Sequence, residues 1–251
     1  MAPSKTSLQI LAVPEELARE AAGIFIARVQ GALREKENCT VVLAGGATPR
    51  GLYSLLAEER DFRAGVPWEK VHFFFGDERH VPPDHPESNF RMVNEVLLSK
   101  VDVPADHVHR IRGEEADASK AAGEYEEVLR SFFRSKPGEI PELDFILLGM
   151  GADGHTASLF PGTEALKERK RLVAANWVPR LNAYRLTMTL PLLNSARCIL
   201  FLVTGEEKAE TLRKVLEEKP DEALPAAFIR PKRGRCLWLV DRSAARLLKT
   251  L

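Results

Sequence analysis

Short apolar runs that alternate with amphipathic helical patterns most constrain the fold of this 251-residue chain. Each run is apolar at nearly every position rather than at every second one; the runs cover residues 40–44, 71–75, 145–148, 198–203 and 236–240. Strands of this kind are covered on both faces, which is typical of a mostly parallel sheet. The alternation therefore predicts an α/β fold with a doubly wound, mostly parallel sheet and helices on both of its faces.

Helical patterns separate the apolar runs. The first begins at Pro14, a residue that suits the first helical turn, and carries an apolar stripe from Leu17 to Leu33. The predicted helices cover residues 14–34, 49–59, 89–98, 118–133, 206–217 and 242–248. The same alternation continues beyond the weakest joints, residues 80–87 and 134–142, so we expect a single domain over residues 1–251.

The charge balance limits the classes of partner. Lys and Arg together number 36, as do Asp and Glu, so no net field draws the chain to nucleic acid or to an anionic membrane. Residues 1–8 lack the apolar core of a signal peptide, and no apolar run approaches the roughly 20 residues of a membrane span. Three scattered cysteines, Cys39, Cys198 and Cys236, indicate a reducing compartment. We expect a cytoplasmic monomer or weak homo-oligomer.

A glycine turn follows the first apolar run. Ligands of doubly wound sheets bind beyond the carboxyl ends of the strands, and the unusual residues of this chain cluster there. Gly45 and Gly46 allow a sharp turn and close approach of a ligand, while Thr48 suits the N-cap and Pro49 the first position of the next helix. The free N–H groups of such a helix start suit a phosphate. A tight strand-to-helix turn without a ligand fits these residues equally well.

Charged residues follow the second run. Asp77 and Arg79 come directly after residues 71–75, where they form either a solvated turn or part of a site. The loop beyond them ends at Ser88, which suits a helix cap, and Asn89. The spacing of four possible ligands in this region fits no standard zinc or calcium pattern, so we expect no metal there: His80, Asp84, His85 and Glu87.

A glycine-rich loop follows the third run and presents Asp153 and His155. Gly151 is one of three glycines within six residues, which indicates a loop in an unusual conformation. A single histidine is more often structural than catalytic, but imidazole titrates near neutrality, and this position favours a general base. Ser158 lacks the GxSxG context of a nucleophile, and we expect it in the interior of a short helix.

Two further cations are candidates. Thr204 and Glu207 have the spacing of a capping box, which places Lys208 in the first turns of a helix. The helix macrodipole disfavours a cation at that position. The position becomes favourable if Lys208 shares a bound anion with another cation such as Arg79. Arg185 opens an alternating strand, residues 185–191, and either faces the ligand or is a strand-end charge.

Taken together, these motifs resemble the glucosamine-6-phosphate isomerase/6-phosphogluconolactonase family, on its lactonase side. The resemblance covers nearly the whole chain, and its motifs occur in this order: GGATP at 45–49, GDERHVP at 76–82, ESN at 87–89, GMGADGHTASLFP at 149–161, RLTMTLP at 185–191 and TGEEKAE at 204–210. Each motif is weak to moderate by itself, but the set at these separations is specific.

The resemblance implies a Rossmann-like fold and a cofactor-free hydrolysis of 6-phospho-D-glucono-1,5-lactone to 6-phospho-D-gluconate, in the oxidative pentose phosphate pathway. By motif position, His155 resembles the family's general base and Asp153 the acid beside it. The expected substrate- and phosphate-binding residues are Gly45, Gly46, Thr48, Asp77, Arg79, Ser88, Asn89, Gly151, Arg185 and Lys208. Among these, Arg79 and Lys208 match the phosphate-binding cations, and Gly45, Gly46 and Thr48 match the phosphate-side loop.

The expected mechanism needs one base and a water nucleophile, because a δ-lactone is an activated ester. Neutral His155 would take a proton from the attacking water and return one to the ring oxygen. Asp153 would orient the imidazole, as a carboxylate does in hydrolytic triads, provided that the loop curls to bring the two side chains together. Otherwise Asp153 would bind substrate hydroxyls.

Two other functions remain as alternatives. The related glucosamine-6-phosphate deaminase, a sugar-phosphate isomerase of the same fold, has a glutamate five residues beyond the histidine. This chain has Phe160 there, which cannot transfer a proton, and it has Arg79 where the deaminase has tyrosine. A non-catalytic sugar-phosphate sensor is the third reading, and the presence of both Asp153 and His155 argues against it.

Overall fold

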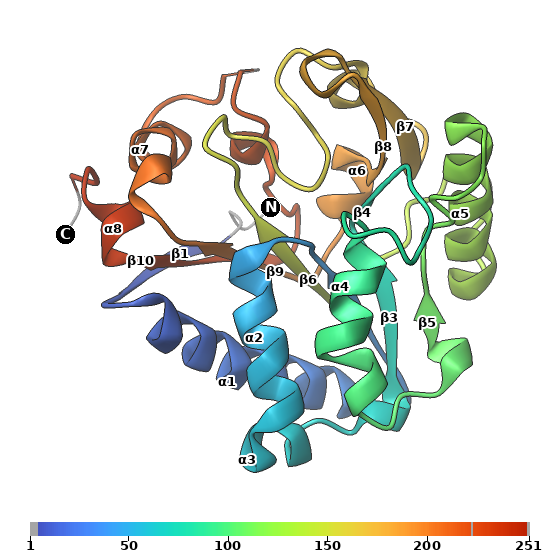
Figure 1. Cartoon of the computed structure of the whole chain (residues 1–251), viewed down its shortest axis with the longest axis horizontal. Coiled ribbons are helices and arrows are strands. Elements are labelled where there is room, and N and C mark those ends of the chain that lie inside the picture. The colour runs from blue at the N-terminus through green and yellow to red at the C-terminus, as the bar shows by residue number, and fades with distance from the viewer. Residues whose placement is uncertain (1–4, 222, 250–251) are drawn as a thin grey trace.

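A seven-stranded sheet forms the centre of the computed structural model, which describes residues 5–221 and 223–249 (Figure 1). All of its neighbouring strands are parallel. Their order is β1-β10-β9-β6-β2-β3-β5, and their bounds are Lys5–Leu11 (β1), Cys39–Leu43 (β2), Val71–Phe75 (β3), Val108–His109 (β5), Phe145–Gly149 (β6), Cys198–Val203 (β9) and Arg235–Asp241 (β10). The predicted parallel α/β fold is confirmed. The five predicted runs form the five strands between the two edges of the sheet, β10, β9, β6, β2 and β3.

The two edge strands were absent from the prediction for a physical reason. β1 is half-exposed or exposed wherever its side chains are described, and β5 has two residues, so neither has the buried apolar run by which the others are recognised. Residues 1–4 and 250–251, the two ends of the expected domain, lie outside the described residues. Residues 1–4 are also half of the stretch 1–8 in which the sequence predicts no signal peptide. Among the described residues, no helix combines the length and the hydropathy needed to span a membrane.

Helices cover both faces of the sheet (Figure 1). Because strand-to-strand crossovers are right-handed, the helices that lead from β1 towards β5 lie on one face and those that lead back towards β10 lie on the other. The first group is α1 (Pro14–Leu33), α2 (Ala47–Glu58), α3 (Arg60–Ala64) and α4 (Asn89–Val96). The second is α5 (Ala118–Phe133), α6 (Leu190–Leu193) and α7 (Ala209–Glu217), and the short α8 (Arg242–Ala245) follows β10.

Three predicted helices are shorter than expected. The pattern over 89–98 gives α4, which ends at Val96, followed by a separate 3₁₀ turn, Leu98–Lys100. Residues 206–217 divide into a 3₁₀ turn, Glu206–Lys208, and α7. The last pattern, 242–248, forms only the four residues of α8. Hydrophobic periodicity continues through a turn even where the backbone geometry changes.

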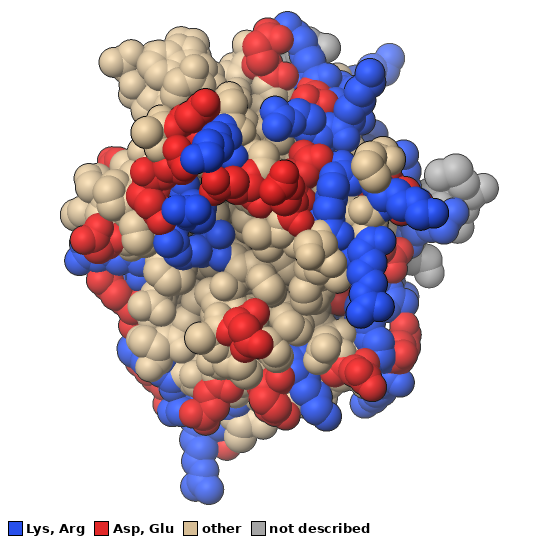
Figure 2. Space-filling view, turned by 90° about the vertical axis from the view of Figure 1, so that its right-hand side faces the viewer, with Lys and Arg blue, Asp and Glu red and all other residues tan. Residues whose placement is uncertain are grey.

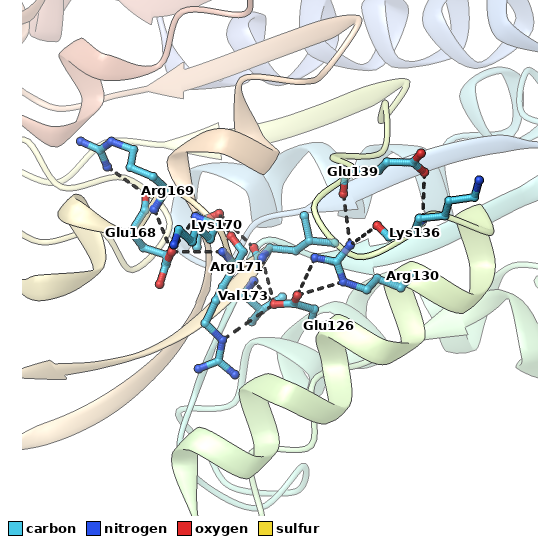
Figure 3. A network of polar contacts seen from close by, with 11 residues as sticks. Glu126, Arg130, Lys136, Glu139, Glu168, Arg169, Lys170, Arg171 and Val173 are labelled. Carbon is cyan, nitrogen blue, oxygen red and sulfur yellow. Dashed lines mark hydrogen bonds and ion pairs between the residues drawn. The ribbon is translucent and has the colours of Figure 1, made fainter.

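A second, antiparallel sheet in the order β4-β8-β7 extends from the end of β3. Its strands are β4 (Asp77–Arg79), β8 (Ala183–Met188) and β7 (Val173–Val178). Only β8 was foreseen, as the alternating run 185–191. Glu126 of α5 attaches this sheet to the main body: its carboxylate accepts the N–H groups of Leu172 (2.9 Å) and Val173 (3.4 Å) and pairs with Arg130 (2.7 Å). Figure 3 shows Glu126 with Val173 and Arg130.

The hydrophobic core is one continuous cluster that extends from Leu17 of α1 to Leu248. Every residue of β2 and β9 is buried, as expected for strands covered on both faces. The three cysteines are free and buried, and burial raises the pKa of Cys39 and of Cys236 to about 12. These thiols therefore serve as small apolar side chains.

Candidate active site

The site lies at the topological switch point of the main sheet. From β2 the chain proceeds outward to β3 and β5, whereas from β6 it proceeds the other way to β9 and β10, so the loops after β2 and β6 diverge from adjacent strands. Ligands of open α/β sheets bind at such a point. A cavity of about 190 Å³ lies there. Nine expected site residues line it: Gly45, Gly46, Thr48, Asp77, Arg79, Asn89, Gly151, His155 and Lys208.

The glycine turn after β2 is built for close approach. A Cβ atom on Gly45 would lie 1.8 Å from Oδ1 of Asn89, so a larger residue cannot occupy this position without displacing the side chain of Asn89. Gly46 has a φ of 103°, which L side chains rarely adopt, and α2 begins directly after it at Ala47. The N–H groups of this first turn have no partners within the helix and are available to an anion.

The predicted caps of two helices were wrong, and for the same reason. Gly46, not Thr48, is the N-cap of α2, and Gly205, not Thr204, precedes the turn Glu206–Lys208, with no side-chain cap at either. The two threonine hydroxyls instead bond to each other, with 2.8 Å between their Oγ1 atoms. Both glycines have a positive φ, and they turn the backbone two residues before Thr48 and one residue after Thr204, which leaves each threonine free to reach the neighbouring loop.

Glu78 organises the segment after β3. It is buried, and its carboxylate accepts the N–H groups of Arg79 (2.8 Å), Asn89 (2.7 Å) and Phe90 (2.8 Å) and the hydroxyl of Ser88 (3.0 Å). Ser88 also caps α4, as predicted, by accepting the N–H of Arg91 (3.1 Å). Ser88 thus contacts Glu78 and the helix and lies outside the cavity lining. The sequence analysis named Asp77 and Arg79 as candidates but gave no role to Glu78 between them.

Asp77 lies at the floor of the cavity and is held by two partners. Its Oδ2 accepts the hydroxyl of Ser158 (2.6 Å), and its backbone oxygen accepts the side-chain amide of Asn89 (3.0 Å). The expectation of a helical Ser158 was wrong: Ser158 lies in a turn between Thr156 and Leu159 that contains a positive φ at Ala157. The turn aims the buried hydroxyl of Ser158 at Asp77, across to the second sheet.

The loop after β6 curls so that Asp153 and His155 touch. His155 Nδ1 lies 2.5 Å from Asp153 Oδ1, and the N–H of Gly151 donates to the His155 carbonyl oxygen (2.9 Å). A Cβ on Gly151 would lie 2.1 Å from Nδ1, so this curl requires glycine. Burial by itself raises the pKa of Asp153, but the hydrogen bond and charge of His155, together with Arg180, lower it to about 2. Asp153 is therefore an anion at neutral pH.

Two side chains that are not among the predicted site residues complete this group. The ring of Phe160 stacks on His155 with 4.4 Å between centroids, and the guanidinium of Arg180 lies 4.7 Å from the centroid of Phe160. Arg180 also pairs with Asp153, at 2.5 Å from Nη2 to Oδ2. Arg180 lies on the connection between β7 and β8, far from any recognisable motif, and no local signal could have identified it.

Cations lie on the other sides of the site. Arg79 lines the cavity and donates to the carbonyl of Glu87 (2.6 Å). Arg185 pairs with Arg79 across β4 and β8, so both side chains lie on one face of the second sheet. Burial, and then the charge of Arg79, lower the pKa of Arg185, and burial lowers the pKa of Lys208. An anion placed among these groups would relieve their repulsion. Arg185 itself is not part of the lining.

The possible metal ligands near the cavity have other partners. His80 Nε2 contacts the carbonyl of Glu115 (2.5 Å), and His85 Nδ1 accepts the N–H of Glu87 (3.2 Å). Within residues 5–221 and 223–249, no three His, Cys, Asp or Glu side chains are arranged to hold a metal ion.

Comparison with known proteins assigns this arrangement to one family. The model of the family described as glucosamine-6-phosphate isomerases/6-phosphogluconolactonase matches residues 12–238. A 6-phosphogluconolactonase of Nostoc sp. is 39% identical over 241 residues, which cover 96% of this chain and 97% of the relative. The human 6-phosphogluconolactonase is 42% identical over 175 residues, or 69% of this chain and 67% of the relative.

Solved structures agree in fold. The 6-phosphogluconolactonase of Thermotoga maritima superposes with a TM-score of 0.80 at 34% identity, covering 94% of this chain and all of that one. A monomeric glucosamine-6-phosphate deaminase gives a TM-score of 0.79 at 26% identity, covering 97% of this chain and 99% of that one. Both branches of the family thus share the architecture described above.

Proposed function

This chain belongs to the glucosamine-6-phosphate isomerase/6-phosphogluconolactonase family, and we propose that it hydrolyses 6-phospho-D-glucono-1,5-lactone to 6-phospho-D-gluconate through His155. The activity is that of a carboxylic ester hydrolase in the oxidative pentose phosphate pathway. The observation that carries the mechanism is the placement of His155: its ring faces a cavity at the switch point, while Asp153 holds one of its two nitrogens.

The contact with Asp153 selects the nitrogen that acts as the base. Asp153 is ionised, so it accepts the proton of Nδ1, and the neutral imidazole then carries its lone pair on Nε2. Nε2 takes a proton from water as the water oxygen bonds to the lactone carbonyl carbon. The imidazolium then gives this proton to the ring oxygen as the carbon–oxygen bond breaks, which opens the ring and restores the neutral base.

The carbonyl oxygen becomes negatively charged in this step and needs hydrogen-bond donors. The N–H of Gly151 donates to the His155 carbonyl oxygen, so it is not available for that purpose. The reaction requires no redox step and no electron sink, and an activated ester needs no Lewis acid, so we propose catalysis without a metal or cofactor.

The opposite side of the cavity binds the phosphate. Arg79, Lys208 and the first-turn amides of α2 supply positive charge there, with Gly45 and Gly46 allowing close approach and Thr48 at the wall. Arg185 adds a further charge beside Arg79. The proposed partners of the sugar hydroxyls are Asp77, which is held by Ser158, and Asn89, which is held by Glu78; both line the cavity.

Phe160 argues against the deaminase reaction. Ring opening and an aldose–ketose proton shuttle need several acid/base groups, and here an apolar ring covers the face of His155. Ammonia release from glucosamine 6-phosphate would contradict the lactonase assignment.

The remaining proposals concern the whole molecule. We propose a single cytoplasmic domain over residues 1–251 that acts as a monomer or weak homo-oligomer and binds no nucleic acid. The balanced charge supports the absence of nucleic-acid binding. On the face that carries α5 and β5, acidic and basic side chains are intermingled (Figure 2). Sedimentation at micromolar concentration tests the oligomeric state.

The decisive experiment is lactone hydrolysis measured against the spontaneous rate. His155→Ala should lower kcat by about 10²–10⁴-fold, the usual contribution of a general base, with a modest change in KM. His107→Gln, outside the cavity lining, is the matched control and should behave as wild type. An unchanged kcat in His155→Ala would remove this residue from the mechanism. A wild type that binds 6-phosphogluconate but leaves the spontaneous rate unchanged would be a sensor.

A further inference from the structure

Arg180 closes a ring of four side chains that includes the imidazole of His155 and is completed by Asp153 and Phe160. We propose that Arg180 is a positioning residue for the hydrolysis: it restrains Asp153 and Phe160 against His155 and offsets the negative charge of Asp153 beside the imidazole. This inference rests on the proposed function of His155. No motif marks Arg180, which approaches the site from the second sheet.

Each side of the ring is a direct contact. Arg180 Nη2 lies 2.5 Å from Asp153 Oδ2, and Asp153 Oδ1 lies 2.5 Å from His155 Nδ1, so each carboxylate oxygen contacts a different side chain. The other side is formed by stacking: Phe160 lies on His155 at 4.4 Å and 28° between planes, and Arg180 lies over Phe160 at 4.7 Å. The imidazole is thereby held at its edge and at one face.

The fold fixes the connection that carries Arg180. β7 and β8 are joined by the 3₁₀ turn Pro179–Leu181, in which Pro179 restricts φ, and Asn182 ends the turn with a φ of 47°. Buried Asn176 of β7 donates to the carbonyl of Ser158 (2.9 Å) and to the hydroxyl of Thr163 (3.0 Å). The β7–β8 hairpin and the loop that contains His155 are therefore bonded into one unit.

The charge of Arg180 should affect proton transfer. Asp153 is the carboxylate in contact with His155, and the other charged residues of the cavity lining are Asp77, Arg79 and Lys208. Removing Arg180 leaves Asp153 without its ion-pair partner, and the surroundings of the imidazole become more negative by one charge. Protonated imidazole is then favoured, and the neutral base is lost at a higher pH than in the wild type.

The test compares Arg180→Met with Arg180→Lys. In Arg180→Met, kcat should fall about tenfold, less than the 10²-fold that a misplacement of 1 Å causes, while KM changes little. The acid limb of its kcat/KM–pH profile should move upward by about 0.5–1 pH unit, the effect of one charge in a partly exposed site. Arg180→Lys keeps the charge but not the planar stack, and its acid limb should return towards that of the wild type.

Arg19→Met is the matched control, because it breaks an exposed ion pair of the same 2.5 Å length between Arg19 of α1 and Glu59 at the end of α2, and it should leave the profile unchanged. An Arg180→Met profile that superposes on the wild type would overturn the inference, as would a change confined to KM, which would make Arg180 a substrate-binding group.

A measurement without substrate separates this inference from the proposed function. The ring signal of His155, assigned by its loss in His155→Gln, is titrated by NMR in the wild type and in both Arg180 variants. A midpoint that rises in Arg180→Met and recovers in Arg180→Lys supports the inference even if the protein hydrolyses no lactone. Equal midpoints overturn it even if hydrolysis is confirmed. Arg180 is half-exposed, so its variants should fold, and Arg180→Gln, which also removes the charge, takes the place of Arg180→Met if that variant does not fold.

Discussion

Glu78 is a buried carboxylate on which four hydrogen-bond donors converge, and replacing it by glutamine separates its charge from its shape. Glutamine has nearly the same volume, so packing is preserved. In Glu78, Oε1 accepts the N–H groups of Arg79 and Asn89, and Oε2 accepts the N–H of Phe90 and the hydroxyl of Ser88. Glutamine keeps only one oxygen that accepts hydrogen bonds, because an NH₂ group, which donates them, replaces the other oxygen.

The magnitude follows from counting donors. The best orientation keeps the oxygen on Arg79 and Asn89 and turns the NH₂ towards Ser88, whose hydroxyl can rotate to accept. The N–H of Phe90 is then left buried without an acceptor, which costs about 1–3 kcal/mol. The two retained bonds lose their charge assistance, whereas removing a buried charge offsets part of the loss, since burial raises the pKa of Glu78. The net destabilisation should be about 2 kcal/mol.

Thermal unfolding and urea titration measure this effect. At about 2–4 °C per kcal/mol for a chain of this size, Glu78→Gln should lower Tm by about 4–8 °C. Because α4 begins at Asn89, KM should rise as the start of this helix shifts. Glu164→Gln, whose carboxylate is 85% exposed, is the control and should leave Tm unchanged. A Tm of Glu78→Gln within about 1 °C of the wild type, less than 0.5 kcal/mol, would refute the reasoning.

Two further predictions concern single groups. Lys208→Met should raise KM for the phosphorylated lactone by about 10–100-fold, the value of one hydrogen bond to a charged group, and should change KM for unphosphorylated gluconolactone far less; equal effects on both would dissociate Lys208 from the phosphate. Burial, and then the charges of His107 and His109, lower the pKa of His72 to about 4. Between about pH 6.5 and 4 the unfolded chain therefore binds more protons at His72, so the free energy of unfolding should fall as the pH falls through this range. His72→Gln should flatten this slope in urea titrations at pH 4–7, and an unaltered slope would exclude His72 as its source.

The sequence alone determined the layers of the fold and the location of the site. Runs such as Phe145–Gly149 are apolar throughout because both faces of a central parallel strand are buried, so burial leaves a local record in the sequence. Motifs at the carboxyl ends of parallel strands lie at the same edge of the sheet, which is why Gly46 and His155 could be expected at one edge; the structure shows that their strands, β2 and β6, are neighbours. Glycine is likewise a local sign of close packing at positions where a Cβ atom would collide with a neighbouring side chain, such as Gly45 and Gly151.

Only the tertiary structure decided which groups complete the site. The hydroxyl of Ser158 bonds to Asp77 across 81 residues, and Arg180 reaches Asp153 from a hairpin of the second sheet. The two threonines that looked like helix caps bond to each other across 156 residues. Such pairings depend on how distant segments pack, and a charged or hydroxyl side chain looks the same in sequence whether its partner is water or a buried carboxylate. Periodicity records burial, whereas the identity of a polar partner is fixed only when the chain has folded.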